Sequence, residues 1–282
     1  MLNTTSRKKG IAGEDLLLYA FLGAFVLLIL FPYIWMVLTS FKPIGEIFTP
    51  QMRLLPREWH PENYLEVLRT GSFGRYVINS IVVTGFGVLL EVSISFLGAF
   101  AFARLDFYGK DFAFYLILGT LMIPPQVLML PSYLIVSDLG WLDSYAGLII
   151  PRAGGAFGIF LLRQFMLTVP SELDDAAQID GASLIQRMIR IYLPLCIPSI
   201  VTLSVFSMIG FWNDYYWPLV ITTQDEMRTL ALGIGHFKSL EGMGQWQLLM
   251  AAATLATIPM ILVFIAARKS LIDNITSGAI KG

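Results

Sequence analysis

The sequence contains few charged residues for its length. Of its 282 residues, 14% are charged and 56% are hydrophobic, whereas soluble domains carry about 25% charged residues. This shortage excludes an ordinary soluble domain and indicates an integral membrane protein. The formal net charge of -1 provides no general attraction to nucleic acid, so we expect no nucleic-acid partner.

Cysteine and histidine are almost absent, which limits the chemistry of any site. The one cysteine, Cys196, excludes an intrachain disulfide. His60 and His236 fall in predicted loops far apart in the sequence, so we expect no catalytic residues and no metal site. The sequence also lacks G-x-x-x-x-G-K-[ST], the loop that holds ATP phosphates. We therefore expect that this chain binds no cofactor, and that any energy its function requires comes from a partner or from an ion gradient.

Long apolar runs are what the sequence has in abundance. A hydrocarbon core of ~30 Å requires about 20 apolar residues in a helix. Backbone polar groups in lipid must be paired within the segment, which favours helices, and the first run is too long for the core of a signal peptide. We predict an all-α polytopic membrane protein with an N-terminal segment 1–15, a transmembrane domain 16–270 and a tail 271–282. The six predicted spans are residues 16–40, 77–103, 112–136, 145–163, 195–221 and 247–267.

The distribution of lysine and arginine orients these spans. With the N-terminus inside, eleven basic residues lie on the inner side, against two on the outer side when the long loop 42–75 is left aside. Inner loops are enriched in such residues. We therefore expect cytoplasmic termini, an external loop 42–75 with a small helix beginning near Pro61, and a cytoplasmic location for residues 164–194.

An unusually acidic stretch, "SELDDAAQIDGASLIQRMIRIYLP", separates two apolar runs at residues 171–194. Ser171 followed by Asp174 is typical of a helix start, with Ser171 as the N-cap. Gly181 permits a sharp change of direction. A second helix then leads to Leu193 and Pro194, where the next span is expected to begin. The stretch predicts a short helix-turn-helix that fits a groove on a partner.

This stretch resembles the EAA loop of permease subunits in binding-protein-dependent ABC importers, although Asp175 stands where the family usually has glutamate. The similarity extends to "GAFAFARLDFYGKD" (98–111), "MIPPQVLMLPSYLI" (122–135), "FLLRQFM" (160–166) and "FWNDYYWPLVI" (211–221). These segments are similar to carbohydrate-uptake permeases of the maltose and glycerol-phosphate type, in particular to the second of two paired subunits. The positions that carry the loop resemblance are Asp175, Ala176, Ala177, Asp180, Gly181, Ala182, Leu193 and Pro194.

The resemblance implies a non-enzymatic subunit in a bacterial or archaeal cell (inner) membrane. It implies a heterodimer with a second permease, two ATP-binding subunits that hold ATP and Mg, and an extracytoplasmic solute-binding protein. Residues 164–194, named the coupling loop from here on, would dock on the ATP-binding subunits. The expected solute is a sugar or related polyol, and the alternative is glycerol-3-phosphate or a glycerophosphodiester. A secondary transporter independent of ATP is the alternative of another class.

Polar residues within or near the spans are the candidates for a solute pathway, because polar groups are costly in a bilayer. Glu91 should face the interior of the helix bundle, where a structural role is the alternative. Arg152 and Asp214 have similar predicted depths and are expected to approach one another, unless Arg152 extends alone to the headgroups. Pro124 and Pro125 should interrupt the third span. The full set of pathway candidates is Asn79, Ser80, Glu91, Arg152, Asn213, Asp214 and Tyr215.

Overall fold

The computed structural model describes residues 13–279, except 52, 71, 236 and 238–243. Every element of secondary structure in these residues is helical, which confirms the all-α prediction. The elements are α1 Gly13–Ser40, α2 Ile44–Ile47, α3 Glu62–Arg69, α4 Phe73–Arg104, α5 Lys110–Thr120, α6 Pro125–Asp138, α7 Tyr145–Ile149, η1 Ile150–Arg152, α8 Ala156–Leu167, α9 Ser171–Ile179, α10 Leu184–Arg187, η2 Met188–Tyr192, α11 Leu193–Trp212, α12 Tyr216–Ile221, η3 Asp225–Met227, α13 Leu230–Ile234 and α15 Trp246–Ala279.

The long helices account for four of the six predicted spans, and two bent pairs of helices cover the other two. Four helical stretches of the described chain are long and apolar enough to cross a membrane, at 15–40, 73–104, 184–212 and 246–269. Two further segments are long and apolar enough only as bent pairs of helices: α5 and α6 meet at 99°, and α7 with η1 meets α8 at 47°. Pro124 precedes α6 at the first break, as the proline pair predicted. Counting each bent pair as one span gives the expected six.

The predicted limits of the fifth span are wrong at both ends. The continuous apolar helix begins at Leu184 rather than at residue 195, and it ends at Trp212. Pro194 has no N–H to bond the carbonyl four residues before it, and a π-helical turn, η2, lies just before this proline. Helix α12 is a separate piece after a three-residue gap. The last helix also differs from prediction, because α15 continues past residue 270.

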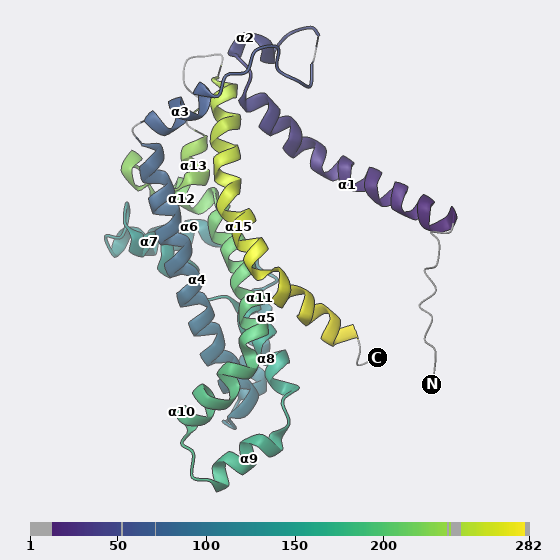
Figure 1. The fold of residues 1–282 in the computed structure, drawn as a ribbon. Coiled ribbons are helices and arrows are strands. Elements are labelled where there is room, and N and C mark those ends of the chain that lie inside the picture. The colour runs from purple at the N-terminus through teal and green to yellow at the C-terminus, as the bar shows by residue number, and fades with distance from the viewer. Residues whose placement is uncertain (1–12, 52, 71, 236, 238–243, 280–282) are drawn as a thin grey trace, which may run out of the picture.

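Helix α4 lies at the centre of the packed body. It packs along α8 and α11 and also contacts α13, η3 and α7. One buried cluster joins Phe96 and Phe100 of α4 to Met166 of α8 and to Tyr192 and Leu203. Helices α3 and α9 lie at opposite ends of this body, as Figure 1 shows. By contrast, α1 diverges from the body (Figure 1), and the most apolar window of this helix is entirely exposed.

The loop 42–75 is tied to the end of α1 through α3. The helix expected near Pro61 forms at Glu62, which confirms that prediction. Its Asn63 side chain donates hydrogen bonds to the carbonyls of Ser40 at 2.8 Å and Lys42 at 3.0 Å. Lys42 is itself buried and donates to the carbonyl of Arg53. These bonds satisfy carbonyls that the C-terminus of α1 leaves unpaired.

The connection before α7 is tight because two backbone segments touch there. Ser144 caps α7 by accepting a hydrogen bond from the N–H of Gly147. A Cβ on Gly147 would lie 2.3 Å from the backbone oxygen of Trp141. On its other side, Gly147 accepts a hydrogen bond from the indole of Trp217 at 2.9 Å. This glycine therefore allows α7 and α12 to pack against the preceding turn.

Asp143 joins this turn to the end of α12. It has a positive φ of 51°, and its carboxylate accepts hydrogen bonds from the Thr223 hydroxyl, the Thr223 N–H and the Gln224 N–H. Burial by itself would raise the pKa of Asp143, but the hydrogen bonds from Thr223 and Gln224 outweigh it and hold the pKa of Asp143 below its usual value. The charged form therefore stabilises the folded state.

Replacing Gly147 by alanine should lower the thermal unfolding temperature of the purified chain in detergent. The added Cβ would meet a backbone oxygen, which has little freedom to move, and overpacking costs about 1–3 kcal/mol or more. Gly74→Ala is the matched control, since no atom lies within 4 Å of its added Cβ. Equal unfolding temperatures for the two variants would contradict the close approach described above.

The stabilisation from Asp143 should depend on pH. Because its folded-state pKa is lowered, the contribution is complete above the ordinary aspartate pKa of about 3.9 and is lost as pH falls through the lower folded-state value. The unfolding temperature of wild type should exceed that of Asp143→Asn at pH 7 and pH 5, and the difference should shrink below pH 4. Thr223→Val, which removes only the hydroxyl donor, should give a smaller effect of the same sign. A difference that stays constant down to pH 3 would contradict this origin.

Candidate functional site

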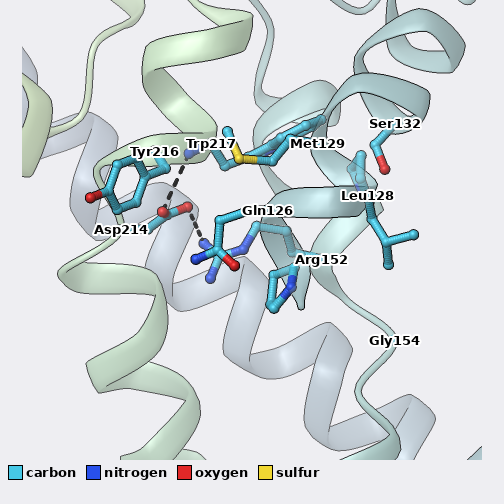
Figure 2. A pocket seen from close by; sticks show the side chains of 11 residues that line it. Gln126, Leu128, Met129, Ser132, Arg152, Gly154, Asp214, Tyr216 and Trp217 are labelled. Carbon is cyan, nitrogen blue, oxygen red and sulfur yellow. Dashed lines mark hydrogen bonds and ion pairs between the residues drawn. The ribbon is translucent and has the colours of Figure 1, made fainter. Parts of the chain in front are cut away.

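Three interruptions in the helices meet at one cavity. The breaks lie at 121–124 before α6, at 153–155 before α8, and at 213–215 between α11 and α12. Residues from all three regions surround a cavity of about 380 Å³, shown in Figure 2. Its lining consists of Pro125, Gln126, Leu128, Met129, Ser132, Pro151, Arg152, Gly154, Asp214, Tyr216 and Trp217. We name it the upper cavity.

An ion pair between Arg152 and Asp214 closes one side of the upper cavity. Arg152 Nη1 lies 2.6 Å from Asp214 Oδ2 (Figure 2), which confirms the expected approach and shows that the alternative of a lone Arg152 is wrong. The other carboxylate oxygen of Asp214 accepts from the N–H of Trp217 at 3.4 Å, in the first turn of α12. The guanidinium also lies 4.6 Å from the ring centre of Phe211. These contacts hold Arg152 across the gap between two helices.

Arg152 also lines a second cavity. It has a volume of about 200 Å³, and we name it the lower cavity. Its polar members include Glu91 and Ser207, and Arg152 lines both cavities. A Cβ on Gly155 would lie 2.7 Å from Glu91 Oε1, so this carboxyl group lies against the N-terminus of α8, where the helix dipole favours negative charge. The position of Glu91 facing a cavity inside the bundle agrees with the expectation.

The residues next to Asp214 have different surroundings. Asn213 is exposed, and its amide donates to the carbonyl of Ile209 at 3.0 Å, which satisfies the end of α11. Tyr215 is 40% exposed, and its ring lies 5.8 Å from that of Tyr216. Neither lines the upper or the lower cavity. A solute contact at these two positions stays a prediction.

Asn79 and Ser80 have structural partners instead of a cavity. Asn79 is fully buried; its amide donates to the carbonyls of Glu226 and Arg228, both at 2.8 Å, and it accepts from the hydroxyl of Tyr145. Ser80 accepts from the N–H of Leu230 at 2.7 Å. These bonds fix the segment 226–230 against α4. The expectation that they contact solute receives no support from this geometry.

Several residues that line the upper cavity are not among the pathway candidates predicted from the sequence. Gln126, Ser132 and Tyr216 line the upper cavity but lie outside any charged or acidic pattern. The proline pair directly before Gln126 was a signal, because an interrupted helix exposes side chains and backbone to a cavity. The proximity of Ser132 to Arg152 could not be derived, since it depends on the 99° bend between α5 and α6.

The coupling loop forms the predicted helix-turn-helix. Helix α9 ends before Asp180, Gly181 turns the chain with a φ of 77°, and Ser183 starts α10 through a capping box with Gln186. The predicted cap at the start is wrong: Ser171 is the first helical residue, and Pro170 precedes it without a side-chain hydrogen bond. The fixed geometry of Pro170 supplies the entry that Ser171 was expected to provide.

The two helices of the coupling loop are joined to each other and expose their tip. Asp174 of α9 pairs with Arg187 of α10 at 3.0 Å, and the N–H of Ala182 donates to the carbonyl of Ala177. Ile179 at the tip is 87% exposed. Of the motif positions, Ala177 and Ala182 are half-buried in the turn, and the exposed ones are Asp175, Ala176, Asp180, Gly181, Leu193 and Pro194. Docking through these positions stays a prediction.

Within the residues that the structure describes, no three His, Cys, Asp or Glu side chains gather as metal ligands would. His236 lies outside the described residues. Cys196 is buried in the cluster around Tyr192. The chemistry of the site thus consists of an ion pair, a second carboxyl group, and amide and hydroxyl groups beside aromatic rings.

Comparison with known proteins places this arrangement in a family. Residues 94–276 match the family described as binding-protein-dependent transport system inner membrane component. The probable ABC transporter permease protein YurM of Bacillus subtilis (strain 168) is 33% identical over 278 residues, which cover 98% of this chain and 91% of that protein. The sn-glycerol-3-phosphate transport system permease protein UgpE of Brucella abortus (strain 2308) is 35% identical, with 89% and 92% covered.

Solved structures agree with these relatives. The chain is similar to one from a bacterial ABC transporter involved in the import of the acidic polysaccharide alginate. The TM-score is 0.82 and the identity 25%, and the match covers 92% of this chain and 98% of the other. A chain from the alginate transporter in complex with an alginate pentasaccharide-bound periplasmic protein shares the fold, with a TM-score of 0.68. The protein therefore belongs to the family of binding-protein-dependent transport system inner membrane components, as a multi-pass permease subunit of an ABC importer of the carbohydrate and glycerol-phosphate type.

Proposed function

We propose that this chain forms a translocation pathway for a neutral sugar or polyol together with a second permease. ATP hydrolysis on two separate subunits drives it through the coupling loop. The observation that carries the proposal is the convergence of three helix breaks on the Arg152–Asp214 ion pair and its two cavities. Interrupted helices line binding sites in membrane transporters because irregular backbone is tolerated where it borders a cavity.

The charges around the cavities favour an uncharged solute. Arg152 is the cationic side chain in the lining of both cavities, and it faces two acids, Asp214 and Glu91. Its charge is already neutralised by the bond to Asp214, so little attraction remains for an anion. The other polar groups, from Gln126, Ser132 and Tyr216, can donate and accept hydrogen bonds as hydroxyl-rich solutes require. The ring of Tyr216 adds a flat surface beside them.

A phosphorylated or acidic solute is the second candidate. The relative from Brucella abortus is named for sn-glycerol-3-phosphate, and the alginate structure concerns an acidic polysaccharide. An anion in the upper cavity would compete with Asp214 for Arg152, because guanidinium groups bind phosphate and carboxylate in the same bidentate way. Opening of the ion pair by solute would therefore distinguish the two candidates.

The proposed assembly follows from the two ends of the molecule. Lysine and arginine distribution favours cytoplasmic termini and a cytoplasmic coupling loop, so the exposed tip around Ile179 would dock on the ATP-binding subunits. The loop carrying α3 lies at the opposite end (Figure 1), where an extracytoplasmic solute-binding protein would deliver solute. The ATP and Mg would be held by the partner subunits, in line with the absence of a P-loop sequence from this chain.

Purification and calorimetry would test this assembly and its solute class. We expect the tagged chain, extracted in mild detergent from its native membrane, to co-purify with a second permease and an ATP-binding subunit. The associated binding protein should bind neutral sugars or polyols more tightly than glycerol-3-phosphate in titration calorimetry. Tighter binding of the phosphate would select the second candidate. Uptake by the chain alone in liposomes without ATP would refute the proposal and indicate a secondary transporter.

Charge reversal would show whether the ion pair supports transport. Arg152→Asp and Asp214→Arg should each reduce ATP-dependent uptake by at least about tenfold, because each leaves like charges together in a half-buried site and 1.4 kcal/mol corresponds to a factor of ten. The double variant should recover part of this loss. The measurement is uptake of the solute that the binding protein retains, in proteoliposomes of the whole complex. A double variant no better than either single variant would remove direct pairing from the mechanism.

A further inference from the structure

Arg104, the last residue of α4, caps the end of α8. Its Nη2 atom donates to the carbonyl oxygens of Met166 at 2.5 Å and Val169 at 2.6 Å. These carbonyls belong to the C-terminal turn of α8 and the linker after it, where helical partners run out. A cation at this end of a helix is also favoured by the helix dipole. Met166 and Val169 are among the first residues of the coupling loop (164–194), so Arg104 holds the incoming side of the loop.

The same guanidinium contacts the outgoing side of the loop. It lies 4.9 Å from the ring centre of Tyr192, which is fully buried. Tyr192 ends the π-helical turn η2 that joins α10 to α11. π-Helical turns are frequent at functional positions. Arg104 therefore touches both segments through which the coupling loop connects to the body, although it lies 62 residues or more away from each of its carbonyl partners in sequence.

A second arginine makes the reciprocal connection. Arg163 of α8 donates through Nε to the carbonyl of Phe102, near the end of α4, at 3.1 Å. Its guanidinium also lies 4.0 Å from the ring centre of Phe114 in α5. Each of the two helices thus supplies an arginine to a carbonyl at the end of the other. The two contacts join α4 and α8 at the end of the body nearest the coupling loop.

The coupling loop and α4 are both suited to move as units. The Asp174–Arg187 pair links α9 to α10, with both side chains about 15% exposed. Each of the other three long apolar helices has an internal proline, at Pro32, Pro198 or Pro259, whereas α4 has none. An α-helix without internal proline keeps its hydrogen-bond ladder and does not kink there. From Arg104, α4 leads to Glu91 at the lower cavity, about 20 Å away at 1.5 Å per residue.

We propose that Arg104 is the positioning residue through which displacement of the coupling loop is carried to α4 and so to the cavities. Helix α11 follows the coupling loop directly in the chain and can move with it. Helix α4 is far from the coupling loop in sequence, so only side-chain contacts can transmit a displacement of the loop to α4. Coupling between distant sites is carried by packed side chains and rigid elements. This inference rests on the proposed ATP-driven function and assigns a role to the "AFAR" segment that the function alone leaves unexplained.

The experiment uses the whole complex in nanodiscs and measures how the upper cavity responds to ATP. Cys196 is replaced by alanine to remove the native thiol, and Ser132→Cys places a new thiol in the upper cavity lining. The rate of reaction with a membrane-impermeant maleimide is compared with and without ATP and vanadate, beside the rate of ATP hydrolysis. In the protein that carries Cys196→Ala and Ser132→Cys with Arg104 intact, we expect ATP with vanadate to change the labelling rate at least about fivefold. Arg104→Ala should hydrolyse ATP but lose most of this change.

Further variants distinguish transmission from a merely structural role. Arg104→Lys keeps the charge but not the fork that reaches two carbonyls, so it should give an intermediate response. If Arg104→Ala fails to assemble, as judged by gel filtration, Arg104→Lys provides the test in its place. Tyr192→Leu should reduce the response, and combining it with Arg104→Ala should add little, because both act on one contact. Lys110→Ala, which removes a cation from an exposed pair with Asp106 near the same end, is the matched control and should behave as wild type.

Two contrary results have different meanings. If the Cys196→Ala, Ser132→Cys protein with Arg104 intact shows no ATP-dependent change in labelling, the proposed ATP-driven function fails. If that background responds and Arg104→Ala and Arg104→Lys respond equally well, the assigned role of Arg104 is overturned while the proposed function stands. An equal loss in Lys110→Ala would also overturn it, since the effect would then reflect removal of any cation at this end of the molecule.

Discussion

The structure depends on the pairing of backbone groups where helices end inside an apolar body. An unpaired carbonyl or N–H in such surroundings costs free energy comparable to a lost hydrogen bond. Water satisfies these groups at the ends of helices in soluble proteins, but a membrane protein with broken spans has helix ends away from water. In this chain, polar side chains from other helices supply the missing partners. Arg104 pairs with carbonyls in the last turn of α8 and just after it, and Asn79 pairs with carbonyls of the segment 226–230.

The same requirement explains how so few polar residues produce a site. Asp214 accepts from the N–H of Trp217 at the start of α12 and also pairs with Arg152. Trp217 in turn donates its indole N–H to the carbonyl of Gly147 in α7. Residues that complete helix ends are thereby brought to the surface of a cavity. In the proposed solute pathway, the same side chains would pair helix ends and bind solute, because a helix end needs polar side chains and so would a solute with hydroxyl groups.

Sequence patterns predicted the features that depend on local chemistry. Hydropathy identified the spans, because helix length and apolar composition are local properties. The proline pair at 124 and 125 predicted the first break, and Gly181 predicted the turn of the coupling loop. The fifth span was misplaced because nothing in residues 213–215 resembles a proline break. Its upstream boundary was missed because the span was expected to begin at Leu193 and Pro194, whereas the helix that starts after the capping box of Ser183 and Gln186 continues through this proline.

The candidate site was predictable in its charged residues and in the pairing of Arg152 with Asp214, but not in its uncharged members. Arg152, Asp214 and Glu91 stood out because charge is rare in apolar segments, and all three line cavities. Asn79 stood out as a polar residue in an apolar segment, yet it is buried among backbone carbonyls. Composition alone cannot separate these cases, since an amide that satisfies a helix end and an amide that binds a hydroxyl look alike in sequence. The arrangement of neighbouring helix ends decides between them.

Helix α4 shows how these constraints combine. It is long and free of proline, and it meets its neighbours closely where it carries glycine: Cβ atoms at Gly87 and Gly98 would come within 2.6 Å of Phe211 and 3.1 Å of Ile159. Near one end of α4, Asn79 holds the segment 226–230. At the other end, Arg104 contacts residues at both the start and the end of the coupling loop. Between them, Glu91 lies against the break before α8. A helix without internal proline that is held near both ends changes its contacts along its length when one end shifts, and the cavities lie along that length.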